Sequence, residues 1–129
     1  MAIGCDTKDA PTLVRFTLED DFSSPEELID LRRALIRAGQ LTAKSCVLLD
    51  LRRAKTFPDL QKLIAAFQAD GVWPFCRAFV VNDHVQYEMA RQLQSALDAQ
   101  TTINQIFQDE TAAMEWLAAL AARSRSIRA

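Results

Sequence analysis

The chain has 129 residues, of which 50% are hydrophobic and 25% are charged. These values are ordinary for a globular protein and fit a single domain over residues 1–129. The formal net charge of -2 gives no reason to expect a nucleic acid as partner. No apolar stretch approaches the roughly 20 residues that span a bilayer, and the first residues lack the features of a signal peptide. We therefore predict a cytoplasmic protein without a transmembrane segment.

The first part of the chain predicts a strand, a helix and a second strand. Residues 12–18 alternate in polarity and are rich in β-forming side chains. Residues 24–27, Ser-Pro-Glu-Glu, form a capping-box pattern with proline at the first helical position, and Gly39 provides the stop. Residues 46–51 are apolar on both faces, as expected of a central strand that is covered on both sides.

The second part repeats this alternation. In chain order, the sequence predicts a helix from Pro58 to Gly71, a strand over residues 77–81, a helix capped by Asn82 or Asp83, a strand over residues 102–107 and a helix opened by Asp109 and Glu110. Four strand–helix units in a row indicate an α/β domain with a mostly parallel sheet. Residues 1–11 and 122–129 are expected to be flexible ends.

Cysteine and histidine usage argues against disulfides and zinc. The three cysteines, Cys5, Cys46 and Cys76, are far apart and odd in number, and the chain has one histidine and no C-x-x-C motif. Cys46 and Cys76 lie beside predicted buried strands, where cysteine acts as a small hydrophobic side chain. We expect neither a metal nor another cofactor.

Polar residues that follow the predicted strands mark the place where a site should be sought. In open α/β sheets, ligands bind beyond the carboxyl ends of the strands. The residues expected there are Asp50, Arg52, Arg53, Asn82, Asp83, His84 and Asp109.

One interpretation of this edge is a phosphoacceptor aspartate. The segment "VLLDLR" with Asp50 resembles the phosphorylated strand end of a response-regulator receiver domain, and Asp20 and Asp21 resemble its magnesium-binding acidic pair. Against it, only one helix fits between Asp21 and Cys46, and the Ser or Thr and the lysine of a receiver are missing from their positions. A solvated turn is the simpler interpretation of Asp20 and Asp21. A receiver sheet also has five parallel strands.

A second resemblance covers about the last two-thirds of the chain. Residues 47–54 (VLLDLRRA), 77–94 (RAFVVNDHVQYEMARQLQ) and 106–120 (IFQDETAAMEWLAAL) resemble, in this order and spacing, the small SpoIIAA-like proteins of the STAS superfamily. The matching positions are Tyr87, Met89, Ala90 and Arg91 in the helix motif, with Glu88 in place of glycine, and Phe107, Asp109, Glu110, Ala113, Trp116 and Leu117 in the closing motif. The resemblance implies a four-to-five-stranded mixed, mostly parallel sheet with about four helices.

The resemblance also implies a binding protein rather than an enzyme. In anti-sigma-factor antagonists of this family, a serine at the start of the helix after the central strand is phosphorylated, which switches partner binding off. Here that position falls near Asp59, a permanent anion, and Thr56 is the only hydroxyl of the turn. We therefore predict regulatory protein–protein binding without the usual phosphoserine switch and without catalytic residues; whether Thr56 is phosphorylated stays open.

The candidate binding residues are Asp50, Arg52, Arg53, Asp59, Asn82, His84 and Arg91. Arg52 and Arg53 can pair with an acidic partner or a phosphate group, or remain solvated in a loop. Arg91 interrupts an apolar helical stripe and is expected to bond a carboxylate or a carbonyl, for instance near Asp50.

Two further partners are considered. Phe67, Phe79 and Met89 can enclose a pocket for a small apolar ligand or lipid, or simply fill the core. An exposed edge strand can bring two copies together as a homodimer.

Overall fold

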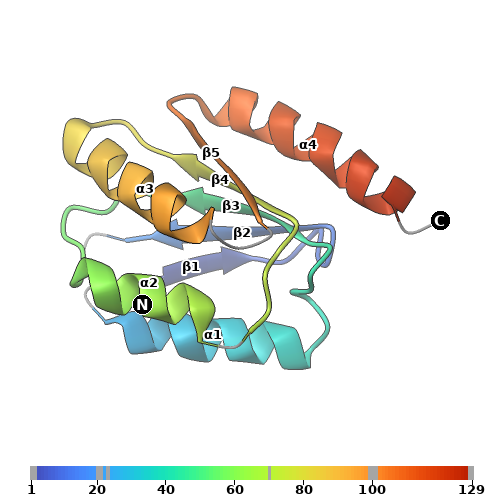
Figure 1. Cartoon of the computed structure of the whole chain (residues 1–129), viewed down its shortest axis with the longest axis horizontal. Helices are drawn as coiled ribbons and strands as arrows, with labels where there is room; N and C mark the ends of the chain where they lie inside the picture. The colour runs from blue at the N-terminus through green and yellow to red at the C-terminus, as the bar shows by residue number, and fades with distance from the viewer. Residues whose placement is uncertain (1–2, 20–21, 23, 70, 99–101, 128–129) are drawn as a thin grey trace.

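The computed structural model describes residues 3–19, 22, 24–69, 71–98 and 102–127, with the side chains of the last helix described as far as Arg123. Its strands are β1 (Ile3–Asp6), β2 (Leu13–Leu18), β3 (Cys46–Asp50), β4 (Cys76–Val80) and β5 (Ile103–Phe107). Its helices are α1 (Pro25–Arg37), α2 (Leu60–Gln68), α3 (His84–Leu97) and α4 (Glu110–Ile127), as labelled in Figure 1.

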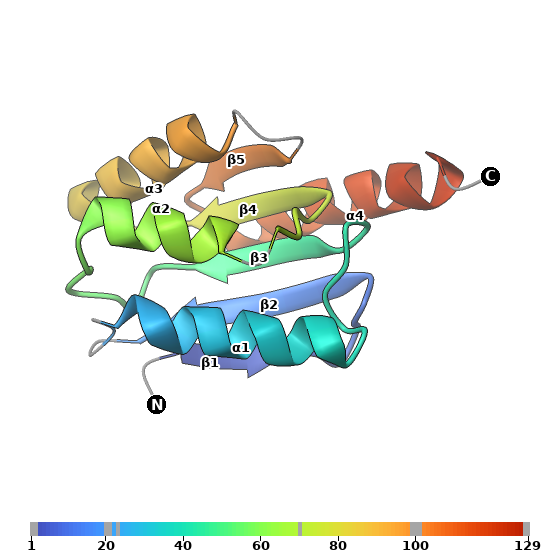
Figure 2. The same ribbon diagram turned by 60° about the horizontal axis from the view of Figure 1, so that its bottom comes forward.

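The five strands form one sheet in which sequence neighbours are also neighbours in space, in the order β1-β2-β3-β4-β5 (Figure 2). Strands β2 to β5 are parallel, whereas β1 pairs antiparallel with β2 and places Ile3 opposite Leu18. The antiparallel edge strand confirms the mixed, mostly parallel sheet. It contradicts a receiver-like architecture, which requires five parallel strands.

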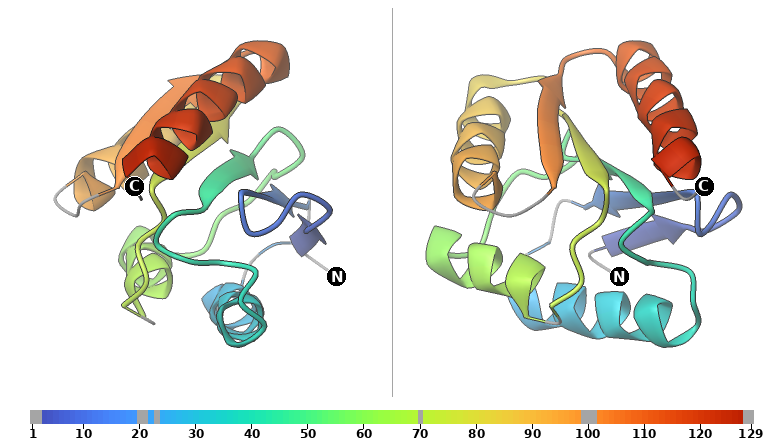
Figure 3. Two further views of the ribbon diagram at one scale, coloured as in Figure 1. Left: turned by 90° about the vertical axis from the view of Figure 1, so that its right-hand side faces the viewer. Right: turned by 45° about the vertical axis from the view of Figure 1, so that its right-hand side comes forward.

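The helices divide unequally between the two faces of the sheet. Helices α1, α2 and α3 pack on one face, and α4 covers the other (Figures 1 and 3). Along β3, Val47 and Leu49 contribute to the core beneath the three helices, and Cys46 and Leu48 to the smaller core beneath α4. All five residues of β3 are buried, because the strand is covered on both sides.

Two arginines are buried beneath the three helices α1, α2 and α3. Their burial was not predicted from the sequence. Arg77 of β4 is fully buried, with its guanidinium carbon 5.2 Å from the centre of the Phe67 ring and its Nη1 atom 3.4 Å from Asn104 Oδ1. Arg32 of α1 is 1% exposed and donates from Nη2 to the Val72 carbonyl at 2.9 Å. These interactions offset part of the cost of burying two charges.

The predicted order of four strands and four helices is confirmed, but both ends of the chain differ from the expectation of flexible ends at 1–11 and 122–129. Residues 3–6 form β1, whose Ile3 is only 1% exposed. The last helix continues to Ile127. Burial of Ile3 against the core explains why so short a segment is held in the sheet.

The signals at the ends of α1 have different outcomes. The capping box fails, because Ser24 makes no side-chain cap and its hydroxyl instead contacts Glu26 Oε2 at 2.9 Å. The predicted stop at Gly39 is confirmed: its φ of 73° is left-handed, and Gln40 N–H donates to the Leu35 carbonyl at 2.9 Å.

In the described part of the chain, no helix is both long and apolar enough to cross a membrane.

Candidate functional site

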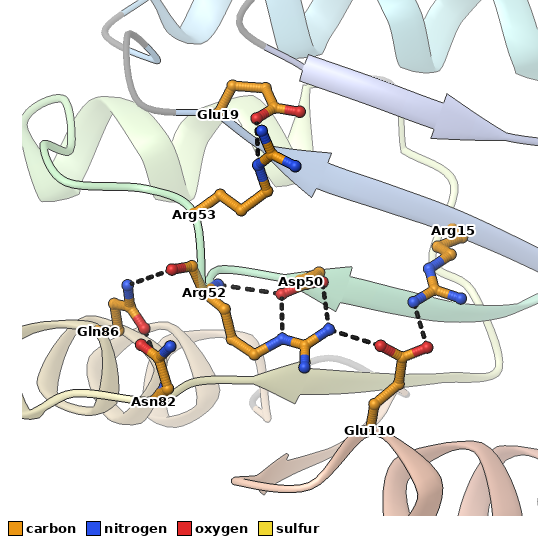
Figure 4. A network of polar contacts seen from close by, with 8 residues as sticks. All are labelled: Arg15, Glu19, Asp50, Arg52, Arg53, Asn82, Gln86 and Glu110. Atoms are coloured by element: carbon orange, nitrogen blue, oxygen red, sulfur yellow. Dashed lines mark hydrogen bonds and ion pairs between the residues drawn. The ribbon is translucent and has the colours of Figure 1, made fainter.

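Asp50 ends β3 at the carboxyl edge of the sheet and is only 5% exposed. Its carboxylate accepts three hydrogen bonds from Arg52: from Nε at 3.0 Å, from Nη2 at 2.8 Å and from the backbone N–H at 3.0 Å (Figure 4). Burial acts to raise the pKa of Asp50, but these hydrogen bonds and the charges of Arg52 and Arg15 hold it below its ordinary value. Asp50 is therefore an ionised, fully engaged carboxylate.

Glu110, the first residue of α4, extends this pair into a four-residue network. Its Oε1 accepts from Arg52 Nη2 at 2.5 Å, and its Oε2 accepts from Arg15 Nη2 of β2 (Figure 4). The hydrogen bond from Arg15 makes the largest contribution to lowering the pKa of Glu110, with Arg52 adding to it. The pKa of Arg52 is raised, chiefly by its hydrogen bonds to Asp50. We call Arg15, Asp50, Arg52 and Glu110 the carboxylate–arginine network; it ties β2, β3 and α4 together.

Gln86 of α3 holds the turn that follows β3. The side chain is 3% exposed, and its Nε2 donates to the carbonyls of Arg52 and Ala54, each at 3.1 Å. Its Oε1 accepts from the backbone N–H of Asn82 at 2.9 Å. Asp83 caps the same helix, accepting from Gln86 N–H at 2.8 Å.

The site predicted from the sequence lacked Gln86, Arg15 and the pairing role of Glu110. For Gln86 a signal existed, because the Asp-x-x-Gln spacing of residues 83–86 is a capping-box pattern. For the pairing of Arg15 with Glu110 there was none, because the two residues lie 95 positions apart.

Other predicted residues lie at this edge without joining the network. Arg53 pairs with Glu19 at 2.8 Å, and its side chain is 69% exposed, which favours the solvated-loop interpretation. Asp59 is the N-cap of α2, accepting from Lys62 N–H at 3.3 Å. The Thr56 hydroxyl donates to the Phe22 carbonyl at 3.5 Å.

Asn82 and His84 lie at the start of α3 and are exposed. Together with Asp83, Tyr87 and Gln108 they line a cavity of about 520 Å³. The structure thus brings three of the residues expected at the carboxyl edge, Asn82, Asp83 and His84, around an open space.

The expected bond between Arg91 and a carboxylate is confirmed, but the suggested location near Asp50 is wrong. Arg91 is exposed on α3 and pairs with Glu88 at 3.0 Å, one helical turn earlier, rather than lying near Asp50. The buried residues of α3 are Gln86, Ala90, Leu93 and Leu97. Arg91 follows Ala90 by one position, about 100° around the helix, which turns it out of this stripe.

The structure describes the residues of the suggested apolar pocket but not those of the suggested acidic pair. Phe67 and Phe79 are buried in the larger core, where they fill space, and Met89 packs against the same core. Asp20 and Asp21 lie outside the described residues. Within the described ranges, no group of three or more His, Cys, Asp or Glu side chains is placed to hold a metal ion.

Comparison with known proteins identifies the fold. Neither protein-family models nor curated protein sequences give a match to this sequence. The structure of this chain superimposes on the crystal structure of an uncharacterised protein of the DUF3478 family from Shewanella loihica PV-4, with a TM-score of 0.64. The superposition covers 90% of this chain and 92% of that protein, which is described as having a SpoIIAA-like fold. The chain has a SpoIIAA-like fold. At 18% sequence identity, the likeness concerns the SpoIIAA-like architecture, which the sequence motifs had implied, and leaves the function of the chain open.

Proposed function

We propose that this domain is a non-enzymatic binding module that recognises a protein partner through the start of α3. The surface concerned consists of Asn82, Asp83, His84, Val85, Tyr87 and Gln108, and we call it the α3 surface. It lies at the carboxyl edge of the sheet, where α/β domains usually bind their ligands.

The exposure of Val85 and Tyr87 carries this proposal. Among the described residues, three large hydrophobic side chains are exposed. Two of them, Val85 at 62% exposure and Tyr87 at 39%, belong to the α3 surface. Tyr87 lines the cavity of about 520 Å³ together with four polar residues, and Val85 is exposed in the first turn of the same helix. Apolar and aromatic side chains within a polar rim are typical of a protein interface.

The state of the charged groups supports binding rather than catalysis. The Asp50 and Glu110 carboxylates are both engaged by arginines, and their lowered pKa values make them poor proton acceptors at neutral pH. The Asp83 carboxylate, which could orient His84 as a base, accepts instead from Gln86 N–H. We therefore assign no catalytic role to these groups.

Asp59 supports a constitutive rather than a switched interaction. It caps α2 near the position where anti-sigma-factor antagonists of SpoIIAA-like fold carry their phosphorylated serine. A carboxylate there supplies negative charge to the helix N-terminus at all times. A regulatory role in the cytoplasm is part of the same proposal.

A capture experiment tests the proposal. The immobilised domain and its Val85→Glu variant are incubated with extract of the source cells, and bound proteins are compared by mass spectrometry. We expect a partner that the native domain retains and Val85→Glu loses, because a carboxylate that the partner must cover in place of an apolar side chain is costly to desolvate. Glutamate in the first turn of a helix does not disturb its folding.

Ile103→Glu is the matched control, since Ile103 is the third exposed hydrophobic residue, at 41%, and lies on β5 away from the α3 surface. Its capture profile should equal that of the native domain. Equal capture by the native domain and Val85→Glu would refute the assignment of the surface.

A further inference from the structure

A second cavity lies on the opposite face of the sheet, near the amino ends of β2 and β3. Helix α4 packs on β3, β4 and β5, and its far end approaches the turn between β1 and β2 (Figure 3). Between this part of α4 and the segment that precedes β2, the structure has a cavity of about 370 Å³. None of the described residues around it belongs to the α3 surface.

The cavity is apolar inside and polar at its mouth. Cys46, Leu117 and Ala121 are buried and form its deepest part, and Leu13 and Met114 are half-buried beside them. Asp9, Thr12 and Ala118 are exposed and form the mouth. The small side chains of Ala118 and Ala121, three positions apart on one side of α4, leave the space unfilled.

The size and lining restrict what the cavity can hold. Its volume is near the lower limit of ligand pockets, which span roughly 300–1,000 Å³, and a dry apolar cavity of only about 150 Å³ already admits benzene. An unbranched or singly ringed molecule with an apolar body and a polar end therefore fits, because the lining combines apolar side chains with the polar residues Asp9 and Thr12.

Asp9 indicates which polar group a molecule bound in this cavity would carry. It is the one charged residue among the described residues that line the cavity, and its side chain lies at the exposed mouth. A carboxylate favours a cationic hydrogen-bond donor and disfavours another carboxylate.

We propose that this cavity binds a small apolar molecule that carries a protonated amino group, with the hydrocarbon part against Leu117 and Ala121 and the amino group at Asp9. The site is independent of the proposed protein-binding function, because the two surfaces share no residue.

Titration of the ¹⁵N-labelled domain with three probes of equal chain length, n-octylamine, n-octanol and n-octanoate, tests the proposal. We expect saturable shifts of amide signals in α4 and at the amino ends of β2 and β3, with affinity falling in that order. Asp9→Asn should weaken octylamine binding roughly two- to fivefold and leave octanol unchanged, because the charge of a solvent-exposed carboxylate contributes modestly.

Ala118→Phe and Ala119→Phe form a matched pair on α4, since both alanines are exposed and only Ala118 lines the cavity. Ala118→Phe should abolish binding of the amine and the alcohol, and Ala119→Phe should leave both unchanged, with unchanged amide spectra elsewhere showing that each variant is folded. The proposal is overturned if octylamine gives no saturable shifts, if Ala118→Phe binds as the native domain does, or if octanoate binds as tightly as octylamine.

Discussion

Arg52 and Asp50 form a bidentate pair at the end of the central strand, with Nε and Nη2 of the guanidinium 3.0 and 2.8 Å from the two carboxylate oxygens. The Asp50 side chain is 7% exposed and that of Arg52 is 31% exposed. The arginine thus covers the carboxylate and reaches outward to Glu110, so that one side chain holds together the edge of the sheet and the start of α4.

Replacing Arg52 with alanine should destabilise the domain by about 1–3 kcal/mol, because it leaves the buried Asp50 carboxylate without its main donor. Urea unfolding followed by circular dichroism measures the effect. Arg53→Ala is the control: Arg53 is next in sequence and also paired, but its side chain is 69% exposed, so its loss should cost less than about 0.5 kcal/mol. Equal losses in the two variants would contradict this view of the network.

The stability contributed by Asp50 should depend on pH. Its pKa is lowered in the folded protein, so the folded state favours the ionised form. The contribution is therefore fully present above the unfolded-state pKa of about 4 and is lost as the pH falls through the lower folded-state value. Unfolding free energies of the native domain and Asp50→Asn, measured from neutral pH downward, should differ at pH 7 and converge below about pH 4. If the difference in unfolding free energy between the two proteins grew toward acid pH, the pKa of Asp50 would be raised in the folded state rather than lowered.

Gln86→Ala should destabilise the domain by about 1–3 kcal/mol, because it leaves the carbonyls of Arg52 and Ala54 without their donor in a buried setting. Gln92→Ala provides the same substitution on the exposed side of the same helix and should be neutral or slightly stabilising, since alanine is the better helix former. Chemical denaturation of both variants decides the point. A neutral Gln86→Ala would mean that the turn after β3 is held by other contacts.

The three thiols should differ in reactivity toward Ellman's reagent. Cys5 is exposed on β1, whereas Cys46 and Cys76 are buried beneath α4. Although Cys5 is open to solvent, partial desolvation by the protein around it, followed by the charge of Asp6, raises the pKa of its thiol, so its reaction should be slower than that of a free cysteine but complete without unfolding. One equivalent should react in the native protein and none in Cys5→Ser, with the remaining thiols released in denaturant. Rapid reaction of a second thiol in the native state would disprove burial of the pair.

The parts of the fold that could be predicted from the sequence are those that a pattern of neighbouring residues determines. The apolar runs of β3 and β4 and the glycine after α1 are local patterns, and they predicted the framework correctly. Strand β1 was missed because four residues, Ile-Gly-Cys-Asp, contain one strong β-former and no alternation. Its presence depends on the burial of Ile3 by residues distant in sequence.

The candidate site was harder to predict than the fold. The sequence placed Asp50 and Arg52 at the carboxyl edge of the sheet, where the structure has them, because strand ends can be read from the sequence. The partner of Arg52 across the sheet, Glu110, lies 58 positions away, and no spacing rule connects the two. Arg91 was assigned to the apolar stripe of its helix, although one position, about 100° around the helix axis, is enough to turn a side chain from that stripe to the surface.

The unequal distribution of helices has a consequence for the lifetime of the protein in a cell. Beneath α4, the side chains of Leu48, Ala78 and Val80 have no exposure to water, and in the described structure α4 is the helix that packs on them. A protease that cuts the short connection between β5 and α4 would leave α4 held by non-covalent contacts alone, and its dissociation would uncover that apolar surface. The nicked chain should then aggregate or be degraded rather than persist as a smaller domain, so the attachment of α4 by Glu110 to Arg15 and Arg52 also protects the chain against irreversible loss.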